Sequence, residues 1–420
     1  MPHTTPRPER KSRPSAADLL GAVALILAPL CLSADDLFII EANGSRGSGS
    51  SLPDLIQDFL LARGQFSELE GQPAYNAELT YAGVANAIEM DVGTTGLEVV
   101  LRIPTTGFER TFTGTSREDV ENQIEDFVKD DGAREWGRFN REMAKRSLVA
   151  VTDGNPNSTT AHAANSMFQE FGRRPGRTQL DRSIGRAAGS RIGFSLIPAY
   201  SQFEAGDFGG EVYSLRFAFK AKFTERIGLV LLAPANYVRV EGAEVYHLGA
   251  TAGLPLTLIP DRGRDPLYWK VTPSAGIIGS GSADFAAGGL VEHYAVTSLL
   301  AYQLGNFTLS MGNQYGTYRG RNSSYRDFDI RTDLDQRIIK NGLTLSVPFG
   351  YRWVMDVYVE ETRFRKEAAI NRYRGVGGDL VFRLPGPWGV GRGYLTAGGG
   401  YDFGDDYSAI KGRAGFGWRF

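Results

Sequence analysis

The feature that most constrains this chain is an alternation of side-chain character with a period of two, which begins near residue 191 and continues to the end. In residues 211–223, EVYSLRFAFKAKF, large apolar side chains occupy the odd positions from Tyr213, and Arg216, Lys220 and Lys222 occupy even positions. Successive side chains of a strand point to opposite faces, so the two faces meet different surroundings. Strands of soluble proteins have about five or six residues. Here the alternation runs for about 11 residues, the length of a tilted strand that crosses a bilayer.

Repetition of this pattern predicts an antiparallel transmembrane β-barrel of about 12 strands over residues 191–420, with ten or fourteen strands left open. Short connections at 224–226, 304–306 and 350–351 all fall between even and odd strands, and the longest, 319–340, falls between an odd and an even strand. The predicted strands are 191–202, 211–223, 227–239, 244–256, 268–279, 289–303, 307–318, 341–349, 352–364, 372–384, 393–403 and 408–420.

Composition and charge argue against three other classes of protein: helical membrane proteins, nucleic-acid-binding proteins and disordered chains. The mean hydropathy of −0.23, with no apolar run of about 20 residues beyond the N-terminus, excludes a helical multi-pass membrane protein. A formal charge of −2 gives no electrostatic footprint for nucleic acid. The 52 glycines occur together with 11% aromatic residues, which Gly-rich disordered chains lack.

The N-terminus predicts export. Residues 1–34 combine a basic segment, an uncharged apolar stretch from Leu19 to Leu32 and small residues before Asp35, as in a signal peptide cleaved after Ala34. Cys31, the only cysteine, would leave with this signal. The mature chain then has no disulfide and no thiolate chemistry.

Residues 35–190 have a different character. Residues 35–51, rich in Gly and Ser, predict a flexible linker. Residues 52–185 predict a soluble α+β domain with a helix from Leu52, short strands over 77–114, a helix capped by Thr115 or Ser116, and further helices over 133–146 and 159–171.

The chain ends in Ala-Gly-Phe416-Gly-Trp418-Arg-Phe420, with aromatic residues at alternate positions of the last predicted strand. Together with the export signal and the repeated alternation, this ending resembles a Gram-negative-type outer-membrane β-barrel. The resemblance covers about 191–420. It implies location in the outer membrane, contact with its lipid, and recognition of Phe416, Trp418 and Phe420 by the barrel-assembly machinery.

Alternation also assigns charged residues to the barrel interior, nine basic and four acidic when Arg419 is included. This excess predicts a narrow pore that mildly favours small anionic solutes, although pairing of the charges across the lumen is the equally weighted alternative. The candidate lumen residues are Arg216, Lys220, Lys222, Lys270, Arg352, Asp356, Glu360, Asp379, Arg383, Asp402, Lys411 and Arg413. With this pore, or a structural and docking role, we expect 35–185 to lie in the periplasm.

Two other functions stay open. A soluble domain followed by a twelve-stranded barrel resembles an autotransporter, which exports or displays its own N-terminal part, and the predicted helix 159–171 suits the segment that threads the barrel. An outer-membrane lipid hydrolase would need a Ser–His pair, for which His293 with Thr308, Ser310 and Ser346 are the available groups. No catalytic residue, metal-binding spacing or cofactor motif is predicted, so we do not expect an enzyme. The solute and the oligomeric state are not predicted.

Overall fold

The structure is a computed structural model that describes residues 36–94, 96–129, 132–173, 192–260, 266–325, 328–350, 352–384 and 393–419. The predicted export signal, residues 1–34, lies outside the described residues, as does the predicted end of the soluble domain at 185. No helix in the described part is long and apolar enough to cross a membrane.

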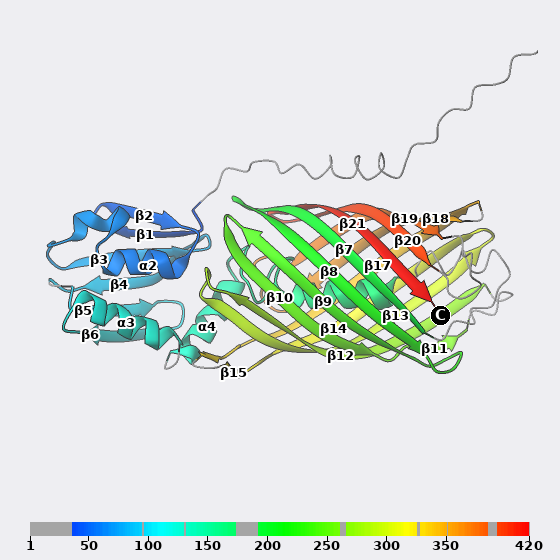
Figure 1. Ribbon diagram of the computed structural model, residues 1–420, viewed down its shortest axis with the longest axis horizontal. Coiled ribbons are helices and arrows are strands. Elements are labelled where there is room, and N and C mark those ends of the chain that lie inside the picture. Colours follow the sequence, from blue (N-terminus) through cyan, green and yellow to red (C-terminus); the bar gives the residue numbers. More distant parts are fainter. Residues whose placement is uncertain are drawn as a thin grey trace, which may run out of the picture. The chain divides into compact units, whose positions relative to one another are not determined.

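The N-terminal part is built on a six-stranded antiparallel sheet in the order β2-β1-β3-β4-β5-β6. The helices α2 (Leu52–Leu60) and α3 (Arg117–Lys129) contribute apolar side chains to its buried core, and the helix α4 (Ala133–Ala144) follows (Figure 1). The α+β class predicted from the sequence is therefore confirmed. The strands are β1 (Phe38–Ala42), β2 (Ser45–Gly49), β3 (Tyr75–Tyr81), β4 (Val84–Val92), β5 (Glu98–Ile103) and β6 (Phe108–Thr113), with a 3₁₀ helix η1 (Gly64–Leu69) between α2 and β3.

The linker prediction for residues 35–51 is wrong over most of that segment, because β1 and β2 form a hairpin there. Its two-residue turn is Asn43-Gly44, with φ of 46° and 85°, and Asn-Gly is the residue pair that best fits such a turn. Gly47 is needed for packing, since a Cβ at this position would lie 2.2 Å from the ring of Phe66. The Gly-rich composition therefore serves a tight turn and a close contact.

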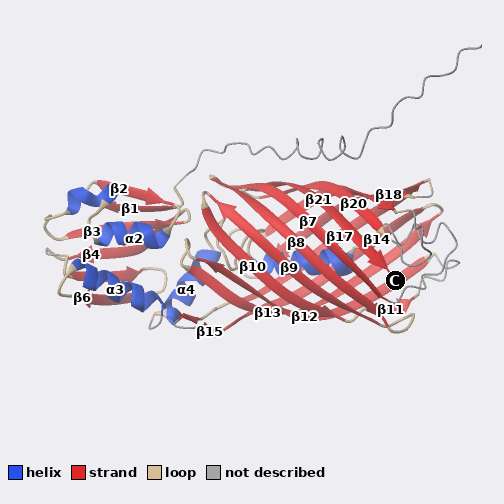
Figure 2. Cartoon of the chain, viewed as in Figure 1, coloured by secondary structure: helices blue, strands red, loops and turns tan. Residues whose placement is uncertain are grey.

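The C-terminal part is a closed antiparallel barrel of twelve long strands (Figure 2). Closure comes from pairing of β7 with β21 and of β10 with β12. The predicted number is confirmed, and the strands are β7 (Ile192–Ala205), β8 (Phe208–Lys222), β9 (Gly228–Val240), β10 (Ala243–Gly253), β12 (Leu267–Ser282), β13 (Ala287–Leu304), β14 (Phe307–Arg321), β17 (Asp335–Phe349), β18 (Trp353–Phe364), β19 (Arg372–Arg383), β20 (Tyr394–Gly404) and β21 (Tyr407–Arg419). Short additions are β11 (Leu256–Ile259), paired with β12, and the hairpin of β15 (Ser323–Tyr325) and β16 (Phe328–Ile330).

The two ends of the barrel are distinguished by their connections. We call the end with the tight connections at 223–227, 305–306 and 350–352 the turn end; the first residues of β7 and the last residues of β21 lie there. The opposite end, with connections at 206–207, 241–242, 283–286, 322–334, 365–371 and 405–406, is called the loop end.

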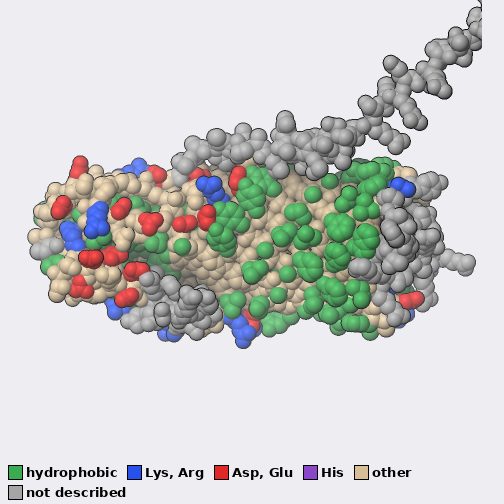
Figure 3. Space-filling model, in the orientation of Figure 1, with side chains coloured by type: hydrophobic (Ala, Val, Ile, Leu, Met, Phe, Trp, Pro, Cys, Tyr) green, Lys and Arg blue, Asp and Glu red, His purple; other side chains and the backbone are tan. Residues whose placement is uncertain are grey.

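The outer surface of the barrel carries a band of exposed apolar side chains (Figure 3). On β8 and just beyond it, the exposed apolar positions run from Tyr213 to Phe223, ten residues that correspond to about 25 Å along the barrel axis at a rise of about 3.3 Å and a tilt of about 40°. Four tyrosines on β7 to β10 are successive cross-strand partners toward the loop end: Tyr200, Tyr213, Tyr237 and Tyr246. Phe349, Trp353 and Phe382 form a second aromatic group at the turn end. An apolar band of this height between two aromatic girdles matches a bilayer.

A helical segment lies inside the barrel (Figure 2). It consists of α5 (Thr159–Met167) and the π-helical turn η2 (Phe168–Gly172). The predicted helix 159–171 is therefore present, but it packs against barrel strands instead of the N-terminal sheet: the Gln314 amide donates to the Ala164 carbonyl at 3.2 Å. The sequence of α5, TTAHAANSM, explains the fit, because a helix of small side chains buried all round can occupy a narrow lumen.

Candidate functional site

The candidate functional site is the filled lumen, which the chain enters from the loop end. Contacts with β17 occur in sequence order: Gln336 Nε2 donates to Asp153 Oδ2 at 2.9 Å, Lys340 bonds to Asn165, and a Cβ on Gly342 would lie 3.0 Å from the ring of Phe168. Because β17 runs from the loop end to the turn end, the segment 153–172 runs in the same direction. The next described strand, β7, starts at the turn end.

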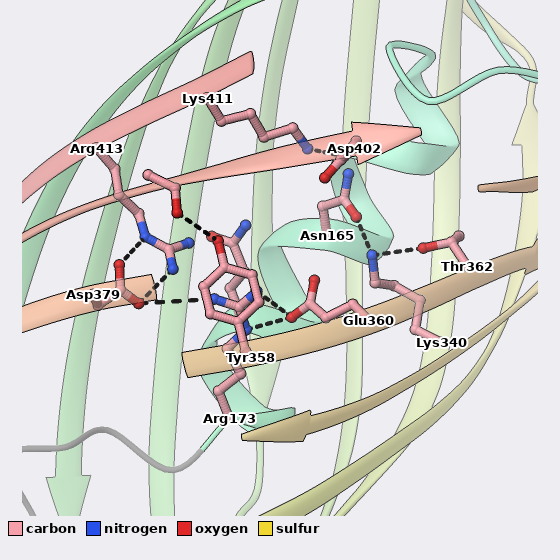
Figure 4. Close-up of polar contacts among 12 residues, drawn as sticks. Asn165, Arg173, Lys340, Tyr358, Glu360, Thr362, Asp379, Asp402, Lys411 and Arg413 are labelled. Atoms are coloured by element: carbon pink, nitrogen blue, oxygen red, sulfur yellow. Dashed lines mark hydrogen bonds and ion pairs between the residues drawn. The ribbon is translucent and has the colours of Figure 1, made fainter. Parts of the chain in front are cut away.

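The strongest anchor of this segment is a cluster around Arg173, shown in Figure 4. The guanidinium of Arg173 lies 3.5 Å from the ring centroid of Tyr358, forms an ion pair with Glu360 and lies 4.0 Å from Asp379. Arg413 donates to Asp379 through Nε at 2.6 Å and lies 5.1 Å from the same ring. Charged groups taken out of water need such pairing, and both Arg173 and Glu360 are nearly buried.

A second polar group holds the middle of α5. The ammonium of Lys340 on β17 donates to the Asn165 side chain and to Thr362 Oγ1 at 2.8 Å (Figure 4). The hydroxyl of Tyr373 donates to the same Asn165 oxygen at 3.3 Å. Nearby, Lys411 is paired with Asp402. Asn165 is thus fixed from two strands, which orients α5 about its own axis.

The far end of the segment contacts β8. Glu170 forms an ion pair with Lys220, and Gln169 accepts a hydrogen bond from Arg216 at 2.5 Å. A cavity of about 100 Å³ remains between η2 and the wall, with Asp356 and Arg413 among its lining residues. Glu170 and Arg173 also line this space, so charged groups of the helical segment and of the wall lie on its two sides.

The twelve predicted lumen residues separate into two groups. Eight lie at the filled lumen, in the contacts above or lining its cavity: Arg216, Lys220, Asp356, Glu360, Asp379, Asp402, Lys411 and Arg413. The other four lie near the turn end, where Lys222 and Arg352 are exposed and Lys270 and Arg383 are half-buried. Several of these charges are paired, as in the alternative in which the lumen charges pair with one another.

Sequence reasoning missed Arg173, Glu170 and Lys340. Arg173 and Glu170 fall within the predicted soluble domain 52–185, and Lys340 falls in the predicted connection 319–340. The alternation could have found Lys340, because Gln336, Ile338 and Lys340 are buried at every second position of β17. Nothing in the local sequence around Arg173 signals a partner more than 180 residues away.

The C-terminal aromatic residues lie at the seam between the first and last strands. Phe416 has ring-centroid distances of 6.0 Å to Phe194 on β7 and 6.1 Å to Trp418. Phe420 lies outside the described residues. Recognition of these residues by the assembly machinery stays a prediction.

Among the described residues, His293 is not brought together with the hydroxyl groups of Thr308, Ser310 and Ser346. His293 Nε2 lies 2.9 Å from Thr251 Oγ1, while Thr308, Ser346 and Ser310 lie toward the turn end of β14 and β17. Cross-strand, His293 is paired with Tyr318 near the loop end. In the described part of the chain, no group of three or more His, Cys, Asp or Glu residues could hold a metal ion.

The N-terminal part contacts the barrel at its loop end. Phe285, in the connection 283–286 between β12 and β13, packs edge-on against Phe38 at 5.5 Å, and its carbonyl accepts from the Tyr81 hydroxyl at 3.1 Å. Trp136 on α4 donates to the Ala286 carbonyl at 2.5 Å. These contacts join the core of the sheet domain to the loop end of the barrel. The start of β7 and the end of β21 lie at the opposite, turn end.

The closed twelve-stranded barrel, its apolar outer band and its aromatic girdles define an outer-membrane β-barrel protein. No protein-family model and no curated protein matches the sequence. Solved structures that resemble it include the translocator domain of the autotransporter NalP from Neisseria meningitidis (16% identity, TM-score 0.43, 62% of this chain and 97% of that one). Another is the β-domain of the Bordetella autotransporter BrkA (13% identity, TM-score 0.40, 55% of this chain and 100% of that one). A third is the COG4313 outer-membrane channel from Pseudomonas putida F1 (10% identity, TM-score 0.39, 56% of this chain and 96% of that one). At these identities and TM-scores the similarities carry no functional argument.

Proposed function

We propose that this protein displays its own N-terminal domain on the outer face of the outer membrane, in the manner of an autotransporter, and that the segment 153–173 remains in the barrel as a tether and plug. This function corresponds to the autotransporter-like alternative predicted from the sequence. It requires the N-terminal domain and the turn end of the barrel to lie on opposite sides of the membrane.

The observation that carries the proposal is the direction of the chain through the lumen. Gln336, at the loop end of β17, contacts Asp153, and Lys220, near the turn end of β8, contacts Glu170. Outer-membrane barrels have short periplasmic turns and longer extracellular loops. With the turn end in the periplasm, the sheet domain at the loop end is extracellular, contrary to the periplasmic location expected with the pore hypothesis.

The paired charges of the lumen also favour a plug over free passage. Ion pairs occupy the space that a solute would need. They join Arg173 to Glu360 and Asp379, and Arg413 to Asp379. An open, anion-favouring pore would leave wall cations available to solutes. The pore stays a prediction that conductance measurements test.

The experiment is labelling of single cysteines on intact cells with a maleimide that does not cross the outer membrane. Glu68→Cys places a thiol on the exposed surface of η1, and Glu225→Cys places the matched control in the exposed connection between β8 and β9 at the turn end. The unsubstituted chain measures background, because Cys31 falls in the predicted export signal.

We expect Glu68→Cys to react on intact cells and Glu225→Cys to react only after the outer membrane is permeabilised. The reverse pattern, with reaction of the Glu225→Cys thiol alone on intact cells, would show that the sheet domain is periplasmic and would overturn the proposal. Reaction of both thiols before permeabilisation would also overturn it, since both ends would then be on one accessible side.

A further inference from the structure

Two buried histidines face one another across the boundary between the plug and the barrel wall. His162 lies on α5 and His247 on β10, with ring centroids 4.8 Å apart and an interplanar angle of 51°. Their exposed fractions are 8% and 2%.

The hydrogen bonds around the two rings determine which nitrogen is available. The Thr159 hydroxyl donates to the Val151 carbonyl at 3.0 Å, so its oxygen accepts the contact from His247 Nδ1 at 3.3 Å, and Nδ1 of His247 carries the proton. His162 hydrogen-bonds to the backbone of Asn157. The Nε2 atom of each ring is buried and has no hydrogen-bond partner among the described residues.

Two unpaired imidazole nitrogens at a buried contact are costly unless a third group joins them. In metal-bound histidines, the N–H of the other ring nitrogen donates to a carbonyl or another oxygen, which fixes the ring. The Nδ1 of His247 has such a contact with Thr159. We propose that His162 and His247 bind a first-row transition-metal ion of the Zn²⁺ class through their Nε2 atoms.

The ring separation fits this site. With Zn–N bonds of about 2.0–2.1 Å and a tetrahedral angle at the metal, two imidazole centroids lie about 5 Å apart, against the observed 4.8 Å. A linear two-nitrogen complex would separate them by about 6 Å with the same bonds. The rings therefore match adjacent positions of a tetrahedron, and imidazole is a ligand that suits Zn²⁺.

The protein supplies two ligands, since no group of three or more His, Cys, Asp or Glu is assembled in the described chain. Small exogenous ligands such as water complete the coordination, which makes the ion exchangeable. Lys411, the cation that interacts electrostatically with His162, is itself paired with Asp402, which reduces repulsion of the metal. The bound ion joins α5 to β10 and so holds the plug against the wall.

The test is calorimetric titration of the untagged, refolded full-length protein with Zn²⁺ alone, comparing the unsubstituted chain with His162→Gln, His247→Gln and His293→Gln. His293 is the matched control, a buried barrel histidine whose Nε2 already contacts Thr251 at 2.9 Å. We expect one Zn²⁺ per chain, retained in His293→Gln. We also expect each of the other two substitutions to weaken binding by at least about tenfold, the lower end of what loss of an outer-shell partner alone costs.

X-ray absorption of the Zn²⁺-loaded unsubstituted protein makes the test independent of how the variants fold, and two imidazole nitrogens in the first coordination shell are expected. Absence of Zn²⁺ binding to the unsubstituted protein would overturn the proposal and leave a trapped water between the rings. Equal binding by all three variants, or a first shell without two imidazoles, would also overturn it.

Discussion

The guanidinium carbon of Arg173 lies 3.5 Å from the ring centroid of Tyr358, and the carboxylate of Glu360, two residues further along β18, is paired with the same guanidinium. One strand thus supplies both an aromatic face and an anion to the last described residue of the plug. A buried arginine held in this way gains from cation–π attraction and from its ion pair together.

Substitution of Arg173 by Met is therefore expected to destabilise the docked plug. It leaves Glu360, 13% exposed at its side chain, without its closest cation, and loss of one partner of a buried pair costs about 3–5 kcal/mol. Unfolding by guanidinium chloride, followed by tryptophan fluorescence, measures the change. The double variant Arg173→Met, Glu360→Gln should recover most of the loss, because neither charge then remains.

Arg374→Met is the matched control for that measurement. Arg374 on β19 lies 3.6 Å from Glu361 on β18, with about half of its side chain exposed. Surface pairs contribute about 0–1 kcal/mol. A loss in Arg374→Met equal to that in Arg173→Met would contradict the assignment of Arg173 as the plug anchor.

Gly312 on β14 allows η2 to lie close to the wall because it has no Cβ. A Cβ at this position would lie 2.1 Å from the carbonyl oxygen of Gly172, which is backbone and cannot rotate away. Gly312→Ala should displace the plug at a cost of about 1–3 kcal/mol, detected as faster protease cleavage within 159–173. Gly281→Ala, in a strand position with open space, is the control and should leave the cleavage rate unchanged.

The barrel could be predicted from the sequence because its outer face meets lipid and its inner face meets the lumen. Apolar and polar side chains therefore alternate along each strand. Leu215 and Arg216 are assigned to opposite faces by their chemistry alone. The contents of the lumen could not be predicted in the same way. His162 and Asn165 lie on a helix of small residues whose pattern fits a soluble domain equally well, and their partners on β10 and β17 come from tertiary contacts that no local period encodes.

Composition was misleading at the hairpin of β1 and β2. Gly and Ser are abundant in flexible linkers, so the composition of residues 35–51 predicts one. The Asn43-Gly44 pair was the local signal for a turn, and strand pairing with β3 supplied the order that composition alone does not show.

The stability of the plug should depend on pH through Asp153, which lies outside the spanning strands in the loop before α5. Burial raises the pKa of this carboxyl from 3.8 to about 6, against hydrogen bonds from Thr160 and Gln336 that favour the charged form. The folded protein therefore holds the proton more tightly than the unfolded chain. This contribution is complete below pH 3.8 and is lost as the pH rises through about 6.

The expected loss from Asp153 across that interval is about 3 kcal/mol. Asp153→Asn keeps a neutral group of the same shape and should remove this dependence, so that the variant is the more stable protein at pH 7. Guanidinium unfolding at pH 4 and pH 7 measures both proteins. An unchanged difference between the two pH values in the variant would contradict the assignment.

Phe416→Ser is expected to impair assembly in cells more than folding in detergent. Phe416 contacts Phe194 across the seam, and the assembly machinery is expected to recognise the terminal aromatic pattern of which it is part. The measurement compares heat-modifiable barrel in isolated outer membranes with the yield of refolding from urea. Phe403→Ser removes an exposed aromatic residue from β20 and serves as the control; equal losses from both substitutions in cells would argue against a C-terminal signal.

Planar-bilayer conductance distinguishes a plugged display barrel from an open pore. Residues 169–173 bind four charged residues of the wall, Arg216, Lys220, Glu360 and Asp379, so the full-length protein should give few and small steps. A chain without residues 36–173 should give larger steps, provided that heat modifiability shows a folded barrel. The wall of that barrel retains five basic and four acidic lumen residues, so its reversal potentials should favour anions only mildly: Arg216, Lys220, Lys340, Lys411 and Arg413 against Asp356, Glu360, Asp379 and Asp402. Large, stable steps from the full-length protein would instead favour the pore, because an anchored helix between these charges leaves no wide path for ions.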